Sequence, residues 1–282
     1  MSRIFLRFPD FKEKALTLSY DDGVRQDKRL ISILDKYGIK ATFNINAGLF
    51  NDKRDSETVG RMTKEEAVEL YSNSVHEIAN HGYKHLHWSV FNDATVVNDV
   101  IKDRSTLESI FGRVIKGMAY PNGSINCTET TVDILKKCGI NYARTTQNTE
   151  KFDIPTDWLK MGATCHHNNP KLMQLAEEFL DSTPKKYFWA NTPKLFYLWG
   201  HSYEFDNNNN WEVIEKFCEF VGGKEDVWYA TNGEIYDYVT AFDRLEFSVD
   251  ESLVYNPSAV DVYIQYYSVK AVIPAGKTVK IK

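Results

Sequence analysis

The chain has 282 residues, enough for one large α/β domain or for a main domain with a small appendage. With 43% hydrophobic and 26% charged residues, its composition lies in the ordinary globular range and allows a sizeable core. The net charge of −5 and the lack of a Lys/Arg-rich run argue against nucleic acid as a partner.

Residues 1–10 carry charge but no continuous apolar stretch, so we expect no signal peptide. No window approaches the uninterrupted apolar length of a membrane helix, so we expect no membrane partner. The four cysteines are scattered without a Cys-x-x-Cys pair, which is typical of buried thiols in a reducing compartment. We therefore expect a cytoplasmic protein, and the sequence leaves its oligomeric state open.

Strand patterns alternate with helical patterns over most of the chain. The strand patterns lie at 16–20, 41–45, 76–80, 115–119, 142–145, 159–164, 195–199 and 227–230. The helical patterns lie at 26–37, 63–71, 93–111, 128–138, 171–180, 211–220 and 234–241. This repeated alternation predicts a parallel sheet, and the number of units favours closure into a barrel.

The pattern changes at about residue 242. Three short β patterns follow, at 245–249, 260–267 and 278–281, with turn residues and no helix between them. We predict a main domain over residues 1–241 and a small antiparallel β appendage over residues 242–282.

Two adjacent carboxylates, Asp21 and Asp22, stand at the end of the first strand pattern and are followed by Gly23. Neighbouring carboxylates repel each other, so we expect one of them to be neutralised, hydrogen-bonded or bound to a cation. Adjacent side chains of a strand point to opposite sides. The two can therefore do different jobs, one on a metal and one beside it.

Two histidines, His81 and His85, follow the strand pattern at 76–80. Their i, i+4 spacing puts both rings on one face if the segment makes a helical turn, and one metal ion can then bridge them. His87 is an alternative, because His85-x-His87 would also point two rings alike on a strand. We favour His81, which lies at a strand exit, where α/β barrels place their chemistry.

Two further strand patterns end in polar residues: one in the turn Tyr120-Pro121-Asn122-Gly123, and one in His201. The order of the four signals, each after a separate strand, carries more weight than any one alone. Cys165-His166-His167 is another cluster of metal-ligand types. It lacks a fourth ligand at a sensible spacing, and we interpret it as a loop.

In this order the motifs resemble those of the polysaccharide deacetylase family, carbohydrate esterase family four, or NodB homology domain. Ser19-Tyr20-Asp21-Asp22-Gly23 is similar to its T-F-D-D-G motif, and residues 81–85 are similar to H-[ST]-x-x-H, with glycine at the second position. Residues 119–123 match R-x-P-[YF]-G only in the proline and glycine. Leu198-Trp199-Gly200-His201 resembles L-x-L-H, with glycine for the second leucine. The resemblance covers roughly residues 12–240.

The resemblance implies a deformed (β/α) barrel of about seven parallel strands that holds a divalent metal on Asp22, His81 and His85. The expected ion is Zn²⁺, with Co²⁺, Ni²⁺ or Mn²⁺ as alternatives. Three nitrogen and oxygen ligands leave open positions for water and substrate. A cation of this kind makes water acidic enough to yield a nucleophile near neutral pH.

The resemblance also implies the remaining catalytic roles. Asp21 would be the general base, the backbone N–H of Asn122 would stabilise the oxyanion, and His201 would protonate the departing amine. The implied substrate is an N-acetylated sugar, oligosaccharide or polysaccharide, with O-acetyl groups as an alternative target. The products of N-deacetylation are acetate and a free amino sugar.

One position departs from the family in a way that concerns catalysis. Ala119 stands where the family usually has an arginine that orients the catalytic aspartate. Arg144, on the strand pattern at 142–145, could supply a guanidinium instead, and an ordinary surface ion pair is the alternative for it. The candidates for the substrate pocket are Tyr120, Pro121, Trp158 and Leu198. For Trp158 and Leu198, core packing is the competing interpretation.

Two other functions compete with deacetylation. The same scaffold could hydrolyse another amide, such as a cyclic amide or a ureide, and the altered motifs at Ala119 and Gly200 leave this open. A protein that binds metal and carbohydrate without catalysis is the second alternative. Asp21 and His201 argue against it, because a pure binder needs neither.

Overall fold

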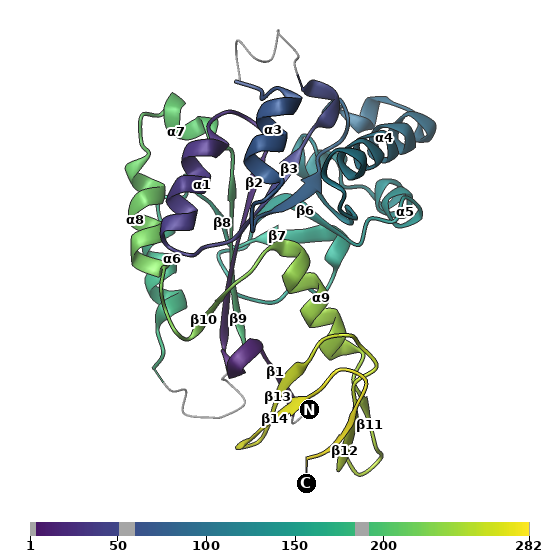
Figure 1. Cartoon of the computed structure of the whole chain (residues 1–282), viewed down its shortest axis with the longest axis vertical. Coiled ribbons are helices and arrows are strands. Elements are labelled where there is room, and N and C mark those ends of the chain that lie inside the picture. The colour runs from purple at the N-terminus through teal and green to yellow at the C-terminus, as the bar shows by residue number, and fades with distance from the viewer. Residues whose placement is uncertain (1–3, 51–59, 184–191, 282) are drawn as a thin grey trace.

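The computed structural model describes residues 4–50, 60–183 and 192–281. Its centre is a parallel sheet with the strand order β7-β6-β5-β4-β3-β2-β9-β8, and β10 also pairs with β2 (Figure 1). The strands are β2 (Lys14–Asp21), β3 (Ala41–Ile45), β4 (Glu77–Asn80), β5 (Gly117–Ala119), β6 (Tyr142–Asn148), β7 (Met161–Ala163), β8 (Cys165–His166), β9 (Lys194–Gly200) and β10 (Val227–Tyr229). The predicted α/β fold with a parallel sheet is confirmed, and the sheet has nine strands among the described residues, two more than the expected seven.

The sheet curls round, and the two strands at its ends, β7 and β8, follow each other directly in the chain. β7 pairs with β6 and β8 pairs with β9, and only Thr164 separates β7 from β8. The backbone N–H of Thr164 donates to the carbonyl of Tyr197 on β9 at 2.8 Å, and its Oγ1 accepts from the N–H of Tyr197 at 3.0 Å. Thr164 therefore joins the two ends of the sheet and gives the deformed barrel its closure.

β2 is the central strand, and every one of its residues is buried. It pairs with β9 along one side, while on the other side its first half pairs with β10 and its second half with β3. A strand that is covered on both faces is typically apolar along its length. The carboxylates at its carboxyl end are therefore exceptions to the pattern of the strand.

Helices surround the sheet in Figure 1. Their buried apolar residues share a hydrophobic core with those of the strands. They are α1 (Asp27–Lys36), α3 (Lys64–Tyr71), α4 (Asp93–Phe111), α5 (Glu129–Lys137), α6 (Leu172–Leu180), α7 (Tyr203–Asn207), α8 (Glu212–Val221) and α9 (Asn232–Asp243). α3 begins with the expected capping box: Oγ1 of Thr63 accepts from the N–H of Glu66 at 3.1 Å, and the Glu66 carboxylate accepts from the N–H of Thr63 at 2.7 Å. Among the described residues, no helix is long and apolar enough to cross a bilayer.

Two small antiparallel sheets lie beyond α9, at the end of the molecule that carries both termini (Figure 1). One has the order β1-β13-β14 and the other β11-β12-β15. Their strands are β1 (Ile4–Arg7), β11 (Glu246–Phe247), β12 (Leu253–Tyr255), β13 (Val262–Tyr266), β14 (Val269–Ile273) and β15 (Thr278–Lys280). The strand at residues 4–7 was not among the strand patterns of the sequence, because its pairing with β13, more than 250 residues away, leaves no local signal.

Residues 159–164 are not one extended segment, as the sequence suggested. Trp158–Lys160 form a 3-10 turn, and β7 begins only at Met161. Asp157 begins this turn, because its carboxylate accepts a hydrogen bond from the N–H of Leu159 at 3.1 Å.

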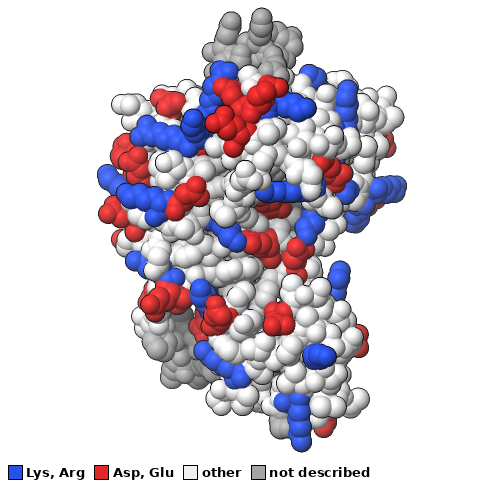
Figure 2. All heavy atoms as spheres, in the orientation of Figure 1, with Lys and Arg blue, Asp and Glu red and all other residues white. Residues whose placement is uncertain are grey.

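The outer surface carries charges of both signs. Lys and Arg side chains are interspersed with Asp and Glu over the face shown in Figure 2.

Candidate active site

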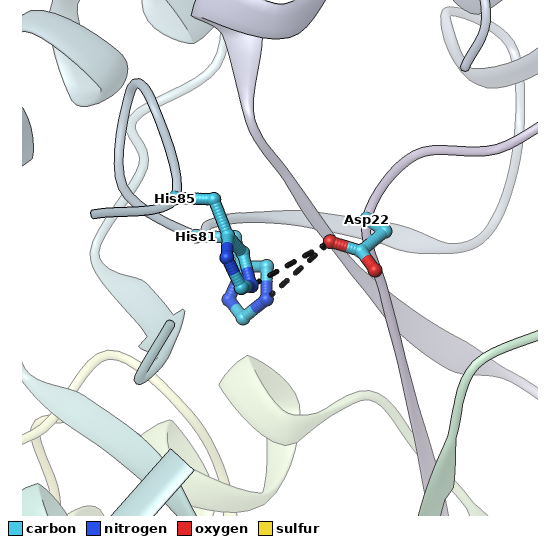
Figure 3. A group of neighbouring side chains, drawn as sticks. All are labelled: Asp22, His81 and His85. Carbon is cyan, nitrogen blue, oxygen red and sulfur yellow. Dashed lines mark ion pairs between the residues drawn. The ribbon is translucent and has the colours of Figure 1, made fainter. Parts of the chain in front are cut away.

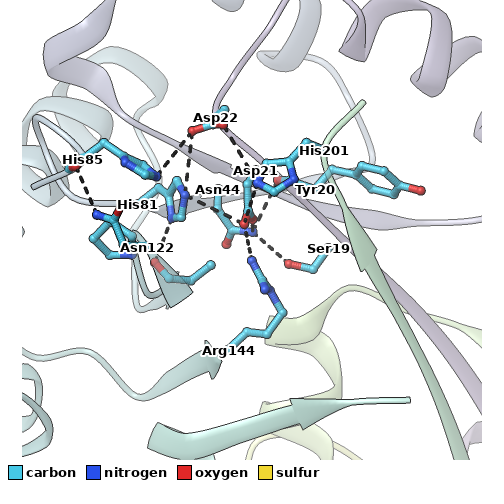
Figure 4. A network of polar contacts seen from close by, with 12 residues as sticks. Ser19, Tyr20, Asp21, Asp22, Asn44, His81, His85, Asn122, Arg144 and His201 are labelled. Carbon is cyan, nitrogen blue, oxygen red and sulfur yellow. Dashed lines mark hydrogen bonds and ion pairs between the residues drawn. The ribbon is translucent and has the colours of Figure 1, made fainter. Parts of the chain in front are cut away.

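The polar residues that follow the strands meet at the carboxyl end of the barrel (Figure 4). Parallel strands present their carboxyl ends at one edge, where α/β barrels carry their active sites. The residues that meet there are Asp21 at the end of β2 and Asp22 directly after it, Asn44 from β3, His81 and His85 after β4, Asn122 after β5, Arg144 from β6 and His201 after β9.

Asp22, His81 and His85 form a group with the geometry of a metal site. Oδ1 of Asp22 lies 3.8 Å from Nε2 of His81 and 3.8 Å from Nε2 of His85 (Figure 3). The three ligand atoms all lie within 4.8 Å of one another. Asp22 has a φ of 88°, a conformation that costs about 1–3 kcal/mol in a non-glycine residue and is enriched at functional sites.

The segment that carries the two histidines makes no helical turn. It is a bend in which Gly82 and His85 have positive φ values of 74° and 52°. A Cβ at position 82 would lie 2.6 Å from Oδ2 of Asp99, so glycine is required by space as well as by conformation. The carboxylate of Asp103 accepts the N–H of His81 at 3.0 Å and so anchors the start of the bend. The alternative ligand His87 is exposed and lies outside the group.

The protonation states of these residues suit a divalent cation. Nδ1 of His81 donates to the carbonyl oxygen of Ala119 at 2.8 Å, which leaves Nε2 free to bind a metal. Burial lowers the pKa of His81 to about 4, against the opposing charge of Asp21, so its ring is neutral. Burial raises the pKa of Asp22, but Arg61 and the nearby histidines outweigh it and keep the carboxylate ionised. Two imidazole nitrogens and one carboxylate oxygen fit a divalent transition metal.

Asp21 lies beside this group and is held by two partners. Its Oδ1 accepts a hydrogen bond from Nδ2 of Asn44 at 2.8 Å, and its Oδ2 accepts one from the guanidinium of Arg144. Burial raises the pKa of Asp21, but Arg144, His81 and His201 outweigh it and hold the pKa below its ordinary value. The carboxylate is therefore ionised and able to accept a proton.

The register of the sheet explains how Arg144 reaches Asp21. Ala119 on β5 and Arg144 on β6 are direct partners in the parallel pairing. The resemblance led us to expect an arginine at position 119 on β5. The guanidinium enters the site from the neighbouring strand, β6, instead. Arg144 is buried, and its guanidinium carbon lies 4.5 Å from the centre of the Trp199 ring.

We expect Arg144→Ala to lower kcat roughly 10- to 100-fold, the range for losing a partner that only orients a reacting group. It should also destabilise the fold by about 3 kcal/mol, because it leaves the buried Asp21 charge without its main partner. Steady-state rates and urea denaturation measure the two effects. Arg25→Ala, which removes an exposed ion pair with Glu66, is the control and should cost less than about 1 kcal/mol. Unchanged turnover in Arg144→Ala would rule out its orienting role.

Arg61 is a site residue that the sequence analysis missed. Its Nη2 lies 3.0 Å from Oδ1 of Asp22, and its Nη1 donates to the backbone carbonyl of Asp22 and, at 2.9 Å, to Oδ1 of Asn46. It enters the site through a bridge with Val24 and belongs to no strand. No local pattern marks such a residue. With Arg144 it balances the charges of the two adjacent aspartates.

His201 lies on the other side of the two aspartates from His81 and His85 (Figure 4). Its Nε2 lies 3.9 Å from Oδ2 of Asp21 and 4.0 Å from Oδ2 of Asp22, and its Nδ1 lies 3.2 Å from Oε1 of Glu204. Burial lowers the pKa of His201, but the hydrogen bond with Glu204 and the two aspartate charges outweigh it and raise the pKa above its ordinary value. The ring is therefore suited to donate a proton. Glu204 was also missed; its only signal is the i+3 spacing from His201.

The predicted oxyanion donor, Asn122, lies at the mouth of the site. It is exposed and has a φ of 55°. Its side-chain Nδ2 donates to the carbonyl of Leu86 at 3.2 Å and to that of His85 at 3.4 Å, and the second contact is drawn in Figure 4. These bonds fix the turn against the His85 segment. Its backbone N–H donates to no residue that the structure describes.

The four candidates for the substrate pocket have packing roles in the structure. Tyr120 is buried, and its hydroxyl donates to the carbonyl of Leu159 at 2.9 Å. Leu198 is buried in the core between the sheet and the surrounding helices, and Trp158 packs edge-on against Tyr236. Pro121 is buried next to Gly82. Its carbonyl oxygen accepts a hydrogen bond from Asn126 at 2.6 Å.

The fold and the site together define a class of protein: a parallel α/β barrel with an Asp-His-His group of metal-ligand geometry at the carboxyl ends of its strands. The polysaccharide deacetylase family model matches residues 9–143. Residues 9–143 thus belong to this family, carbohydrate esterase family four.

Individual relatives are distant. The poly-beta-1,6-N-acetyl-D-glucosamine N-deacetylase of Staphylococcus aureus (strain MRSA252) is 25% identical over 163 residues, which cover 51% of this chain and 54% of the relative. The match thus spans about half the length of that protein. Two solved structures share the fold. A candidate polysaccharide deacetylase from Mycobacterium smegmatis has a TM-score of 0.60 and 17% identity, over 84% of this chain and 94% of the other. A carbohydrate esterase family 4 pseudoenzyme mutant has a TM-score of 0.50 and 15% identity, over 82% and 70%.

Proposed function

We propose that this protein is a metal-dependent hydrolase that removes N-acetyl groups from a sugar, oligosaccharide or polysaccharide. The observation that carries the proposal is the placement of Asp21 and His201 together beside the Asp22–His81–His85 group: Oδ2 of Asp21 lies 3.8 Å from Nε2 of His81 and 3.9 Å from Nε2 of His201. A related fold also occurs in a pseudoenzyme, so the fold alone does not make the case. A metal-ligand group with an ionised carboxylate and an imidazole of raised pKa beside it does support hydrolysis.

Asp22, His81 and His85 would hold the metal, with Zn²⁺ as the first choice and Co²⁺, Ni²⁺ or Mn²⁺ as alternatives. When bound, the cation would polarise the acetyl carbonyl and make a water molecule a stronger nucleophile. Three protein ligands leave open coordination positions for the carbonyl oxygen and for the water molecule.

The remaining steps belong to side chains of this chain. Asp21, held by Asn44 and Arg144, takes a proton from the attacking water as its oxygen bonds to the carbonyl carbon. The backbone N–H of Asn122, which has no acceptor among the described residues, donates to the carbonyl oxygen as negative charge develops there. Nε2 of His201 then protonates the amide nitrogen, the carbon–nitrogen bond breaks, and acetate and a free amine result.

The direct test is a screen for acetate release from N-acetylated glycans, with and without a chelator. We expect release from at least one glycan with a free amine formed in equal amount, and loss of activity on chelation. Acetate release from O-acetylated xylan alone, without amine, would reassign the chain to ester hydrolysis. Ammonia or a ureido acid from cyclic amides, or tight metal and sugar binding without turnover, would contradict the proposal.

The pH profile tests the role of His201. Because Glu204 raises the pKa of His201, Glu204→Gln should lower that pKa. The acid form of His201 is then lost at lower pH, so the alkaline limb of kcat/KM should move to lower pH than in the wild type. The profile is measured at one equivalent of metal, with Glu212→Gln, an exposed substitution, as control. If the alkaline limb of kcat/KM stays in place in Glu204→Gln, Glu204 does not set the pKa of the general acid.

A further inference from the structure

The Cys165-His166-His167 motif has no part in the proposed reaction, and the structure gives it a setting that its sequence did not reveal. β8 brings it beside the end of β9, with Cys165 paired to Leu198 and His166 paired to Trp199. Both histidines therefore reach the strand end that carries His201. The interpretation of the motif as a loop is wrong for Cys165 and His166, which form β8 and pair with a segment some 35 residues later.

Glu204, in the first turn of α7, connects the motif to His201. Its Oε2 lies 3.2 Å from Nε2 of His166, and its Oε1 lies 3.2 Å from Nδ1 of His201. One ligand atom from each of His166, His201 and Glu204 lies within 4.8 Å of the others. The three side chains are 16–23% exposed, so a solvated ion can reach them.

His167 contacts this group from the buried side. Its ring is buried between Tyr20 and Phe205, and its Nε2 lies 2.8 Å from Oε2 of Glu204. Neither ring nitrogen has a well-aligned hydrogen-bond partner among the described residues. Three histidine rings therefore surround the Glu204 carboxylate, and the buried ring of His167 holds it in place.

Gly200 makes room for this arrangement. A Cβ at position 200 would lie 2.0 Å from Nδ1 of His167, so any larger residue would displace the ring. The glycine that departs from the L-x-L-H pattern and the histidine at 167 therefore depend on each other. The cluster is a built feature of this chain, formed by two strands and one helix.

Two imidazoles and one carboxylate are the ligands that divalent transition metals bind in proteins. We propose that His166, His201 and Glu204 form a second divalent-metal site, separate from the Asp22–His81–His85 group, and that a cation bound there inhibits the enzyme. The inhibition rests on the proposed function, whereas the site itself does not.

The inhibitory effect follows from the two nitrogens of His201. Its Nε2 faces the aspartates, while its Nδ1 faces Glu204. A ring bound to a metal through Nδ1 has one proton left, on Nε2, and donating it would leave an imidazolate. This is a far weaker acid than the imidazolium that the unoccupied site allows. Occupation of the second site should therefore remove the general acid without displacing the metal of the first.

Titration of the metal-free full chain with Co²⁺, followed by calorimetry and by the visible absorption of the ion, tests the site directly. We expect two binding events in the wild type. His166→Ala and Glu204→Gln should each weaken the second event at least tenfold and keep the first, and His81→Ala should lose the first and keep the second. His87→Ala, an exposed imidazole outside both groups, should titrate like the wild type.

A single event in the wild type, or two unchanged events in both folded variants, would overturn the second site. Circular dichroism establishes folding for each variant. In the activity arm, acetate release should rise up to one equivalent of Co²⁺ and fall several-fold beyond it, and His166→Ala should lack the fall. If no glycan yields acetate, the proposed function fails, but the Co²⁺ titration still decides whether the second site exists.

Discussion

Asp21→Asn is expected to lower kcat about 100- to 10,000-fold, the usual contribution of a general base. The amide has nearly the shape of the carboxylate and can still accept the hydrogen bond from Asn44, but it cannot take a proton from water. Because Asp21 belongs to no metal-ligand group of the described residues, the first equivalent of metal should still bind. Rates of acetate release and metal content, measured on the same sample, check both expectations.

The control for this prediction is Asp133→Asn, which changes the same charge on an exposed residue of α5. It should leave both rate and metal content unchanged. If Asp21→Asn retained more than about a tenth of wild-type kcat, another group would have to serve as the base.

His81→Ala is expected to remove activity and the first equivalent of metal together. His81 is a direct ligand candidate whose ring is fixed by the carbonyl of Ala119, so its loss removes one of the three ligands. The affinity should fall by more than the roughly 10- to 100-fold typical of losing a partner that only orients a ligand. Dialysis against buffered zinc followed by elemental analysis gives the affinity.

The matched control is His87→Ala, which deletes an exposed imidazole from the same segment. It should retain both metal and turnover. A His81→Ala protein that binds the first equivalent with wild-type affinity would remove His81 from the metal site.

Much of this site could be read from the sequence because its residues follow strands. An apolar run that stops at Asp21-Asp22, or at His201, marks the carboxyl end of a parallel strand, and such ends meet at one edge of the sheet. The start of a helix could also be predicted where neighbouring residues determine it, as with the capping box at Thr63.

What the sequence did not reveal depends on contacts between distant segments. Arg61 reaches Asp22 from a segment without regular structure, and β1 pairs with a strand more than 250 residues later. His166 and Glu204 are brought together only by the pairing of β8 with β9. Arg144 was a candidate, but its place beside Ala119 is a matter of sheet register, which the sequence alone does not fix.

The central claim is that Asp22, His81 and His85 hold one catalytic metal ion. The most direct measurement is anomalous diffraction at the zinc edge from crystals of the protein loaded with one equivalent of Zn²⁺. We expect the strongest peak between Oδ1 of Asp22 and the Nε2 atoms of His81 and His85. A strongest peak at any other place, including the His166–Glu204 group, or the absence of a peak at these three side chains, would contradict the account.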